Sequence, residues 1–356
     1  MIVLVDDKDR ENEGDLVIAA QHCRAADVNF MVTHGRGLVC LALTPERVDA
    51  LRLPMMVRTQ PGDMSTAFTV SIEARSGVTT GISAADRART IQVAADPSCG
   101  AEDLVSPGHV FPLRAKDGGV LVRSGHTEGA VDLARMAGLV PAGVICEIMR
   151  DDGEMARMDD LERFAAVHRL PILAIADLIE HRLRRETLVA EVAHAPLASA
   201  ALGLSPSQGW EVRTFRSTVK PTVMYLAMCK GRLDGGAPVL VRAQRSRVLG
   251  DVFGFGDDSG LRIRAALRQI DRAGAGVFLY VLTTDAFEPD VITPGAAAAG
   301  GEGTSEGVLR QFGLGAQVLA RLGLRRIRVI TDNPRKIVGL RGFGIEVEGT
   351  VPLEDP

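Results

Sequence analysis

The amino-terminal region reads DDKDRENEGD over Asp6–Asp15, directly after the apolar run Ile2–Val5. Six of these ten residues are acidic. In an extended chain alternate side chains share one face, so the carboxylates would repel one another unless a cation lay among them. Hard ions such as Mg²⁺ bind a few carboxylates together with water and substrate oxygens. The pattern therefore indicates a strand followed by a metal-binding loop, with a solvated surface turn as the alternative.

Short β-branched runs and amphipathic stretches alternate along the first half of the chain. Thr44 followed by Pro45 is typical of a helix start, and a second helix is expected from Thr127 onward. The predicted strands are Ile2–Val5, Gly37–Leu43, Ala67–Ile72, Val120–Arg123 and Val144–Met149. These elements predict an α+β fold, that is, a mixed α/β class.

The length of the chain indicates two domains. Its 356 residues exceed what one core usually organises, since a domain takes roughly 150 residues. An Ala/Ser/Pro-rich segment with little periodicity predicts a linker at 191–208, between a first domain at 1–190 and a second at 209–356. The second domain is also expected to be α/β, from strand-like and helical stretches at Glu211–Arg216, Pro238–Arg242, Arg310–Leu322 and Ile327–Thr331. A flexible loop is expected at Thr293–Thr304, which is rich in glycine and alanine.

Composition narrows the class of protein. The formal net charge of −4 leaves no basic stripe for nucleic acid, so small molecules are the expected partners. The five cysteines are odd in number and form no CxxC pair, as suits reduced thiols in a cytoplasmic protein. No apolar run approaches the roughly 20 residues of a membrane span, and the first apolar run is too short for a signal segment. We therefore expect a cytoplasmic protein with no membrane contact.

Several sequence blocks follow one another along the first half of the chain, and their order is evidence in addition to their residues. They are DDKDRENEGD, THGRGLVC (Thr33–Cys40), TAFTVSIEA (Thr66–Ala74), GVTTGISAADRA (Gly77–Ala88), PGHVFPLRA (Pro107–Ala115), RSGHTEGAVDLARMAG (Arg123–Gly138) and CEIM (Cys146–Met149). Together they resemble the 3,4-dihydroxy-2-butanone-4-phosphate synthases over nearly all of residues 1 to 185. Blocks that match in order are far more specific than any single motif.

This resemblance implies a lyase of riboflavin biosynthesis. It would convert D-ribulose 5-phosphate into L-3,4-dihydroxybutan-2-one 4-phosphate and formate, with two Mg²⁺ or Mn²⁺ ions per site and a homodimeric assembly. The implied metal ligands are Glu11 and His126, and the residues implied to be essential for catalysis are His109 and Glu147. Substrate binding is implied for Arg10, Glu11, Asp15, Arg123, Ser124, Gly125, His126, Thr127 and Glu147. The sequence leaves open which residue takes the first proton.

The residues themselves allow plainer readings. His126 lies in a glycine-flanked turn that opens a helix, where backbone N–H groups and Arg123 suit an anion, but a lone histidine is also common in cores. Thr127 could be a simple N-cap and His109 only a turn residue. Glu147 would face either solvent or a desolvated pocket with a raised pKa. Ser106 stands where many relatives have arginine.

The second domain resembles GTP cyclohydrolase II. The matching blocks are KGRLDGGAPVLVRAQ (Lys230–Gln244), GDVFG (Gly250–Gly254), YVL (Tyr280–Leu282) and the long stretch Arg310–Val347. The three zinc thiolates of that family are missing, because the corresponding segments read Arg245-Ser246-Arg247 and Asp257-Asp258-Ser259. Its RQEGRG block is replaced by Thr283–Ala286. We therefore expect no zinc and no GTP chemistry, with a bifunctional enzyme and a non-catalytic sugar-phosphate sensor as the alternatives.

Overall fold

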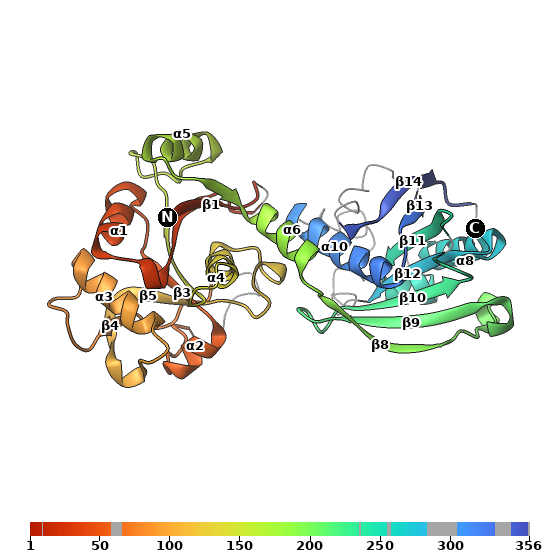
Figure 1. Cartoon of the computed structure of the whole chain (residues 1–356), viewed down its shortest axis with the longest axis horizontal. Coiled ribbons are helices and arrows are strands. Elements are labelled where there is room, and N and C mark those ends of the chain that lie inside the picture. Colours follow the sequence, from red (N-terminus) through yellow and green to blue (C-terminus); the bar gives the residue numbers. More distant parts are fainter. Residues whose placement is uncertain are drawn as a thin grey trace. The chain divides into compact units, whose positions relative to one another are not determined.

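The chain forms two compact units, one built on Met1–Ile179 and the other on Glu180–Gly303 with Gly307–Pro356 (Figure 1). The computed structural model describes all residues except 9, 58–65, 235, 255–257, 283–304, 332–342 and 355–356, and no side chains at 305–312. The loop expected at Thr293–Thr304 and the segment Thr283–Ala286 lie outside the described residues. Both units combine a sheet with helices, so the predicted mixed α/β class is confirmed.

The first unit is built on a seven-stranded mixed sheet of order β4-β5-β3-β6-β2-β1-β7. The pairs β1–β2 and β2–β6 are antiparallel, whereas the pairs β1–β7 and β3–β5 are parallel. The strands are β1 Ile2–Val5, β2 Gly14–Ala19, β3 Cys40–Leu43, β4 Ile72–Ala74, β5 Leu104–Arg114, β6 Ala142–Glu147 and β7 Ile172–Ala174.

Helices of the first unit begin where the sequence provides caps. Thr44 accepts the backbone N–H of Arg47 at 3.2 Å with Pro45 as the first helical residue, and Ser83 caps the next long helix in the same way. The α-helices are α1 Ala25–Phe30, α2 Pro45–Ala50, α3 Ala84–Ala95, α4 His126–Met136 and α5 Met158–His168, and α6 Ile175–Arg185 begins in the first unit and ends in the second. Short helical turns are η1 Ala20–His22, η2 Met31–Gly35, η3 Ala101–Asp103 and η4 Gly119–Leu121. Helix α4 packs on β6 and β2, which brings its first turn to the ends of these strands.

The core of the first unit is aliphatic, in keeping with a chain of only 4% aromatic residues. Four different strands contribute fully buried side chains to it, namely Val3, Leu16, Leu41 and Val144. Burying side chains of this size contributes about 1.5–3 kcal/mol each. The sheet is therefore a rigid base for the loops at the ends of its strands.

Two strand predictions need correction. The stretch Val120–Arg123 is not a strand but the end of turn η4, because Gly118 and Gly119 take φ values of 87° and 63° and reverse the chain. The Val120 N–H then donates to Asp132 of α4 at 2.9 Å rather than to a strand. The expected strand at Ala67–Ile72 is confined to Ile72 and two isolated bridges, with β4 extending beyond it.

The second unit has its own seven-stranded sheet, of order β14-β13-β11-β12-β10-β9-β8. Its strands are β8 Val189–Pro196, β9 Trp210–Ser217, β10 Met224–Lys230, β11 Val239–Arg245, β12 Gly276–Leu282, β13 Arg326–Ile330 and β14 Glu346–Val351. Its helices are α7 Val248–Phe253, α8 Ser259–Ala273 and α10 Ser305–Arg321, with short turns η5 Ala200–Leu202 and η6 Pro206–Gln208. Strand β8 extends into 191–208, the segment predicted as a linker.

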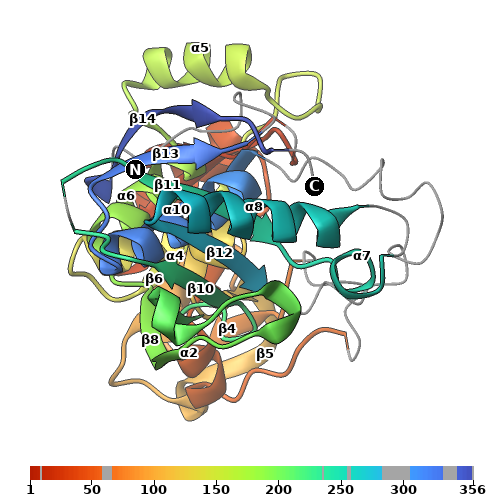
Figure 2. The same ribbon diagram turned by 90° about the vertical axis from the view of Figure 1, so that its right-hand side faces the viewer.

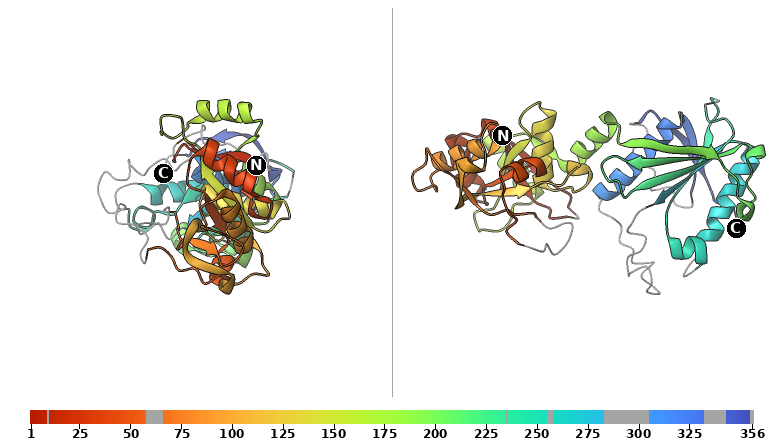
Figure 3. Two further views of the ribbon diagram at one scale, coloured as in Figure 1. Left: turned by 90° about the vertical axis from the view of Figure 1, so that its left-hand side faces the viewer. Right: turned by 90° about the horizontal axis from the view of Figure 1, so that it is seen from below.

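Helix α8 lies along β11 and β12 of this second sheet (Figures 2 and 3). Trp210, Ile270 and Phe278 are buried together between helix and sheet. The described part of the second unit therefore has a hydrophobic core of its own. Among the described residues, no helix combines the length and apolar character needed to cross a membrane.

Candidate active site

A small cavity of about 120 Å³ opens in the first unit. It is lined by Arg10, Glu11, Glu13, Asp15, Cys40, Thr66, Phe68, Leu113, Arg123, His126, Thr127, Ile145 and Glu147. Seven of these residues were predicted as site residues from the sequence. Ser124 and Gly125 lie in the turn directly before α4, whereas His109 is not among the lining residues.

The sheet brings the pocket residues together from distant parts of the sequence. Asp15 on β2 pairs in register with Glu147 on β6, so the two carboxyl groups share one end of the sheet. Arg10 and Glu11 lie in the loop between β1 and β2, and His126 is the first residue of α4. The pocket is thus formed where two strands, one loop and one helix start meet.

Asp6 organises the acidic loop. Its buried carboxyl group binds the Arg10 guanidinium at 2.6 Å and accepts the backbone N–H groups of Glu11 and Glu13 at 3.2 and 2.9 Å. Charge-assisted bonds of this kind are stronger than neutral ones. The loop is therefore closed by its own first acidic residue. The sequence analysis did not predict this role for Asp6. Its position directly after a buried strand was the available signal.

Three side chains of this region form a cluster suited to a cation. Ligand atoms of Asp6, Glu11 and His126 all lie within 4.8 Å of one another. His126 is buried, its Nε2 has no hydrogen-bond partner in the part of the chain that the structure describes, and burial lowers the pKa of its imidazole. A neutral imidazole with an unpaired buried nitrogen is the form that binds metal ions. The donor set of two carboxylates and one imidazole fits a divalent ion.

Asp15 and Glu147 form an acidic pair beside this cluster. Burial, and then the nearby Glu147, raise the pKa of Asp15 well above its ordinary value. Glu147 is half-buried and accepts the N–H of Leu38 at 2.8 Å. A Cβ atom at Gly37 would lie 2.5 Å from a Glu147 oxygen, so only glycine fits there. Of the two readings for Glu147, the structure supports a position in the pocket.

Arg123 contributes a guanidinium group to the lining of the pocket. Its guanidinium pairs with Glu128 at 2.7 Å, and both side chains are buried. A Cβ atom at Gly125 would lie 2.2 Å from Arg123, so the glycine makes room for the guanidinium beside the start of α4. Gly125 is also the N-cap residue, so Thr127 is not an N-cap and lies inside the helix. Arginine and the first N–H groups of a helix are together suited to a phosphate.

Cys40 lines the same pocket as a neutral group. Burial raises the pKa of its thiol, with Glu147 adding to the effect. Cys40 is 2% exposed, so it contributes a small apolar surface to the pocket lining.

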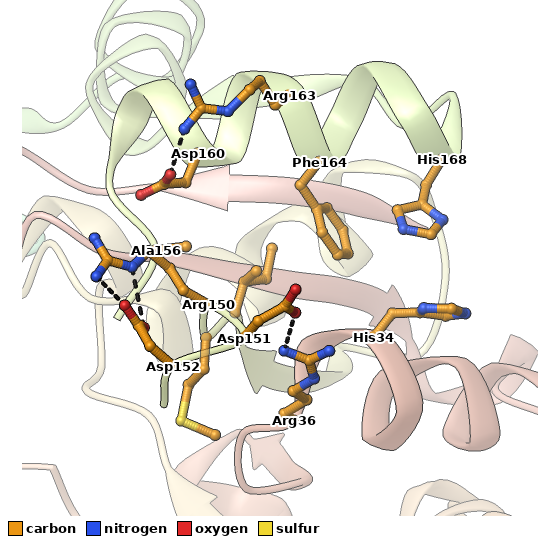
Figure 4. Close-up of a pocket in the computed structure, with 12 residues that line it drawn as sticks. His34, Arg36, Arg150, Asp151, Asp152, Ala156, Asp160, Arg163, Phe164 and His168 are labelled. Atoms are coloured by element: carbon orange, nitrogen blue, oxygen red, sulfur yellow. Dashed lines mark hydrogen bonds and ion pairs between the residues drawn. The ribbon is translucent and has the colours of Figure 1, made fainter. Parts of the chain in front are cut away.

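A larger cavity of about 510 Å³ lies elsewhere in the first unit (Figure 4). It is lined by residues from η2, α5 and the segment after β6, including His34, Phe164 and His168. Its charged residues are already paired, Arg36 with Asp151, Arg150 with Asp152 and Arg163 with Asp160. None of the predicted site residues lines this cavity. The smaller pocket, which is lined by seven of the predicted site residues, is therefore the candidate active site.

Family models match both units. The model described as 3,4-dihydroxy-2-butanone 4-phosphate synthase matches residues 1–181, and that of GTP cyclohydrolase II matches residues 198–352. The chain belongs to the 3,4-dihydroxy-2-butanone 4-phosphate synthase family, and it is a synthase of riboflavin biosynthesis. The order of the two domains expected from the sequence is confirmed.

Individual relatives cover nearly the whole chain. The riboflavin biosynthesis protein RibBA of Aquifex aeolicus is 46% identical over 368 residues, which cover 99% of this chain and 89% of that protein. A 3,4-dihydroxy-2-butanone 4-phosphate synthase of Pseudomonas aeruginosa is 45% identical over 357 residues, with coverage of 99% and 95%.

Solved structures agree with this assignment. The crystal structure of RibBX from A. baumannii, a two-domain 3,4-dihydroxy-2-butanone 4-phosphate synthase, superimposes with a TM-score of 0.80 at 38% identity and covers 99% of this chain and 95% of that chain. A 3,4-dihydroxy-2-butanone 4-phosphate synthase in complex with two magnesium ions gives a TM-score of 0.50 at 43% identity, covering 52% of this chain and 91% of that chain.

Proposed function

We propose that the synthase converts D-ribulose 5-phosphate into L-3,4-dihydroxybutan-2-one 4-phosphate and formate in the small pocket of the first unit. The observation that carries this assignment is the metal-suited cluster of Asp6, Glu11 and His126 beside the paired acids Asp15 and Glu147. Arg123 and the start of α4 line the same pocket, and their N–H groups are where the substrate phosphate would bind.

Glu11 and His126 would hold a divalent ion, and Asp6 lies within reach of it. When bound, such an ion polarises carbonyl and hydroxyl oxygens and lowers the energy of an ene-diolate. A solved relative contains two magnesium ions, which supports two Mg²⁺ ions here, with Mn²⁺ as the alternative. The ligands of these ions other than protein side chains would be substrate oxygens and water, as is usual for Mg²⁺.

The remaining pocket residues would bind the substrate and move protons. Asp15 has a raised pKa and would hold its proton, so that it donates a hydrogen bond to a substrate oxygen. Glu147 is fixed by the Leu38 N–H and would act as a proton acceptor. Arg10 and Arg123 would orient the phosphate end, with Ser124, Gly125 and Thr127 offering polar groups of the turn beside it.

His109 would act on the same substrate from a second copy of the chain. Its side chain is 43% exposed, and it does not line the pocket of its own chain. A group that transfers protons must come within hydrogen-bond reach of the reacting atom. A homodimer in which each first unit completes the pocket of its partner meets this requirement, and twofold dimers are the commonest oligomers.

The decisive assay is formate release from ribulose 5-phosphate. The purified chain should produce formate with added Mg²⁺, and chelation should abolish this activity. Binding of ribulose 5-phosphate without formate would instead favour the sugar-phosphate sensor. Full turnover after exhaustive chelation would contradict the metal site.

We propose further that the second unit carries no zinc site and does not convert GTP. Its sequence has no cysteine in either segment where the family has zinc thiolates, and its one cysteine, Cys229, is buried in β10. Carboxylates such as Asp258 favour Mg²⁺ or Ca²⁺ over tetrahedral zinc. The similarity to relatives named RibBA is the reason to retain a bifunctional enzyme as the alternative.

Elemental analysis of the full chain, combined with a GTP assay, tests this second proposal. We expect far less than one zinc per chain and no product from GTP under conditions in which the same preparation releases formate. Zinc near one equivalent together with GTP turnover would show that the chain is bifunctional.

A further inference from the structure

His109 is not alone at the surface of the first unit, because a buried glutamate lies directly behind it. The His109 Nδ1 atom is 2.7 Å from Oε2 of Glu73, and the same oxygen accepts the backbone N–H of His109 at 3.2 Å. The two side chains differ in exposure, with 43% of His109 exposed and only 11% of Glu73. One ring nitrogen therefore faces the protein interior.

A bulge in β5 creates this arrangement. Adjacent residues Ile72 and Glu73 of β4 pair with Val110 and Val105 of β5, which leaves the four residues 106–109 without partners in the ladder. The extra residues fold back over β4, and a Cβ atom at Gly108 would lie 2.0 Å from the Ile72 carbonyl oxygen. Bulges re-aim side chains in this way. Here the bulge places the His109 ring over the Glu73 carboxyl group.

The other side of Glu73 is held by the core. The hydroxyl of Thr90 on α3 lies 3.1 Å from Oε1 of Glu73, and it also accepts the N–H of Ala74 at 3.0 Å. A Cβ atom at Gly81 would lie 2.1 Å from Glu73 and 2.7 Å from the His109 ring, at a φ of 87°. Glycine at position 81 thus lets the loop close over the pair, because a side chain there would collide with both residues.

We propose that Glu73 is a positioning residue that fixes the tautomer of His109, with hydrogen on Nδ1 and a free electron pair on Nε2. This inference rests on the proposed role of His109. The carboxyl oxygen, already an acceptor for a backbone N–H, accepts Nδ1–H, and Nε2 is then the atom that takes up a proton from the substrate. The imidazolium that forms is stabilised by the adjacent carboxylate, as a buried acid does for a catalytic histidine in other enzymes.

The first test reads the tautomer directly. Nitrogen-15 spectra of the histidine-labelled full chain, with His109 assigned by loss of its signals in His109→Gln, should show hydrogen on Nδ1 in the wild type. In Glu73→Leu the hydrogen should move largely to Nε2. Hydrogen on Nε2 in the wild type would overturn the inference, and this measurement needs no turnover.

The second test separates positioning from packing. Glu73→Leu should lower kcat by about 10²–10⁴-fold, the usual contribution of a proton-transfer group, with KM changed less than about threefold. Glu73→Gln keeps an acceptor for Nδ1–H, so it should recover at least about a tenth of the wild-type kcat. Thr90→Val should lower the melting temperature but keep kcat, because the His109–Glu73 bond remains.

A matched pair in the second unit serves as the control. His194 and Glu211 form a similar contact of 3.0 Å, but both are well exposed. Glu211→Gln should leave formate release unchanged. If Glu73→Leu kept the wild-type kcat, or if it and Glu73→Gln lost activity equally while Nδ1–H persisted, Glu73 would not position His109. If the wild type released no formate, the proposed function would fail, while the tautomer measurement would still decide this inference.

Discussion

At the scale of single residues, the pocket contains buried polar atoms that have no hydrogen-bond partner among the described residues. His126 Nε2 and Asp15 Oδ1 are both buried without hydrogen bonds, and such atoms cost free energy unless a ligand satisfies them. His126 Nδ1 lies 3.8 Å from Asp15 Oδ1, too far for a hydrogen bond. The site is therefore arranged for groups other than its own.

Removing a metal ligand should abolish the activity without unfolding the chain. We expect Glu11→Gln and His126→Ala each to lower kcat/KM by more than about 100-fold, since losing a direct ligand should exceed the effect of losing a supporting contact. The binding of Mg²⁺, measured by calorimetry, should weaken in parallel. His22→Ala is the control, because His22 is exposed in η1. A ligand variant with near wild-type kinetics would move the metal elsewhere.

Asp15→Asn should make the protein more stable but less active. Because the pKa of Asp15 is raised in the fold, its contribution to stability is fully present below its ordinary pKa of 3.8 and is lost as pH rises toward the folded-state value. Asparagine has no such loss. In EDTA at pH 7.5 the variant should therefore melt higher than the wild type, by about 2–4 °C per kcal/mol gained, while its kcat falls.

The same comparison at low pH checks the cause. Well below the ordinary pKa of 3.8, the melting temperatures of Asp15→Asn and the wild type should converge, because Asp15 is then protonated in both the folded and the unfolded chain. A constant difference across this range would mean that ionisation of Asp15 is not responsible.

At the scale of secondary-structure elements, sequence patterns located β1, β6 and the start of α2 because each depends on local signals. The core strands Ile2–Val5 and Val144–Met149 are apolar runs, and Thr44-Pro45 is a local cap. Turn η4 did have a local signal in Gly118-Gly119, but the apolar run after it was interpreted as a strand. The β5 bulge was not predicted because it depends on pairing with the distant strand β4. In the same way, the separation of His109 from the pocket follows from strand order, which no local pattern contains.

The contact between α4 and β6 should be sensitive to a single methyl group. A Cβ atom at Gly143 would lie 2.6 Å from the Cβ of Ala130, so Gly143→Ala must push α4 away from the sheet. We expect a loss of about 1–3 kcal/mol in the free energy of unfolding, the usual cost of overpacking. Activity should fall as well, because His126 begins this helix.

Gly349→Ala provides the control for this experiment. Gly349 also lies in a strand, β14, but a Cβ atom there would have nothing within 4 Å. This variant should keep the stability and formate release of the wild type. If the two variants behaved alike, the close contact with Ala130 would not determine the position of α4.

At the scale of the whole molecule, a pocket shared between two chains predicts how much activity returns when two inactive variants are mixed. Glu11→Gln and His109→Gln should each be inactive as homodimers. A heterodimer of the two would contain one intact pocket, with Glu11 from one chain and His109 from the other. Random re-association of equal amounts should restore about a quarter of the wild-type activity, because half of the dimers are mixed and each has one working site.

Mixing two preparations of the same variant is the matched control and should restore nothing. Sedimentation at the assay concentration should show a dimer for each protein. An absence of recovery in confirmed heterodimers would place His109 in the pocket of its own chain or outside the reaction.

The Asp6 carboxyl group also gives the acidic loop its own reporter. The backbone N–H groups of Glu11 and Glu13 donate to this one carboxyl group, which is buried. Their hydrogens can exchange with deuterium only when the loop opens and releases them. The exchange rates of these two amides therefore measure the free energy of loop opening in the resting protein. The slowing of that exchange on adding Mg²⁺ gives the share of metal affinity that is used to keep the loop closed.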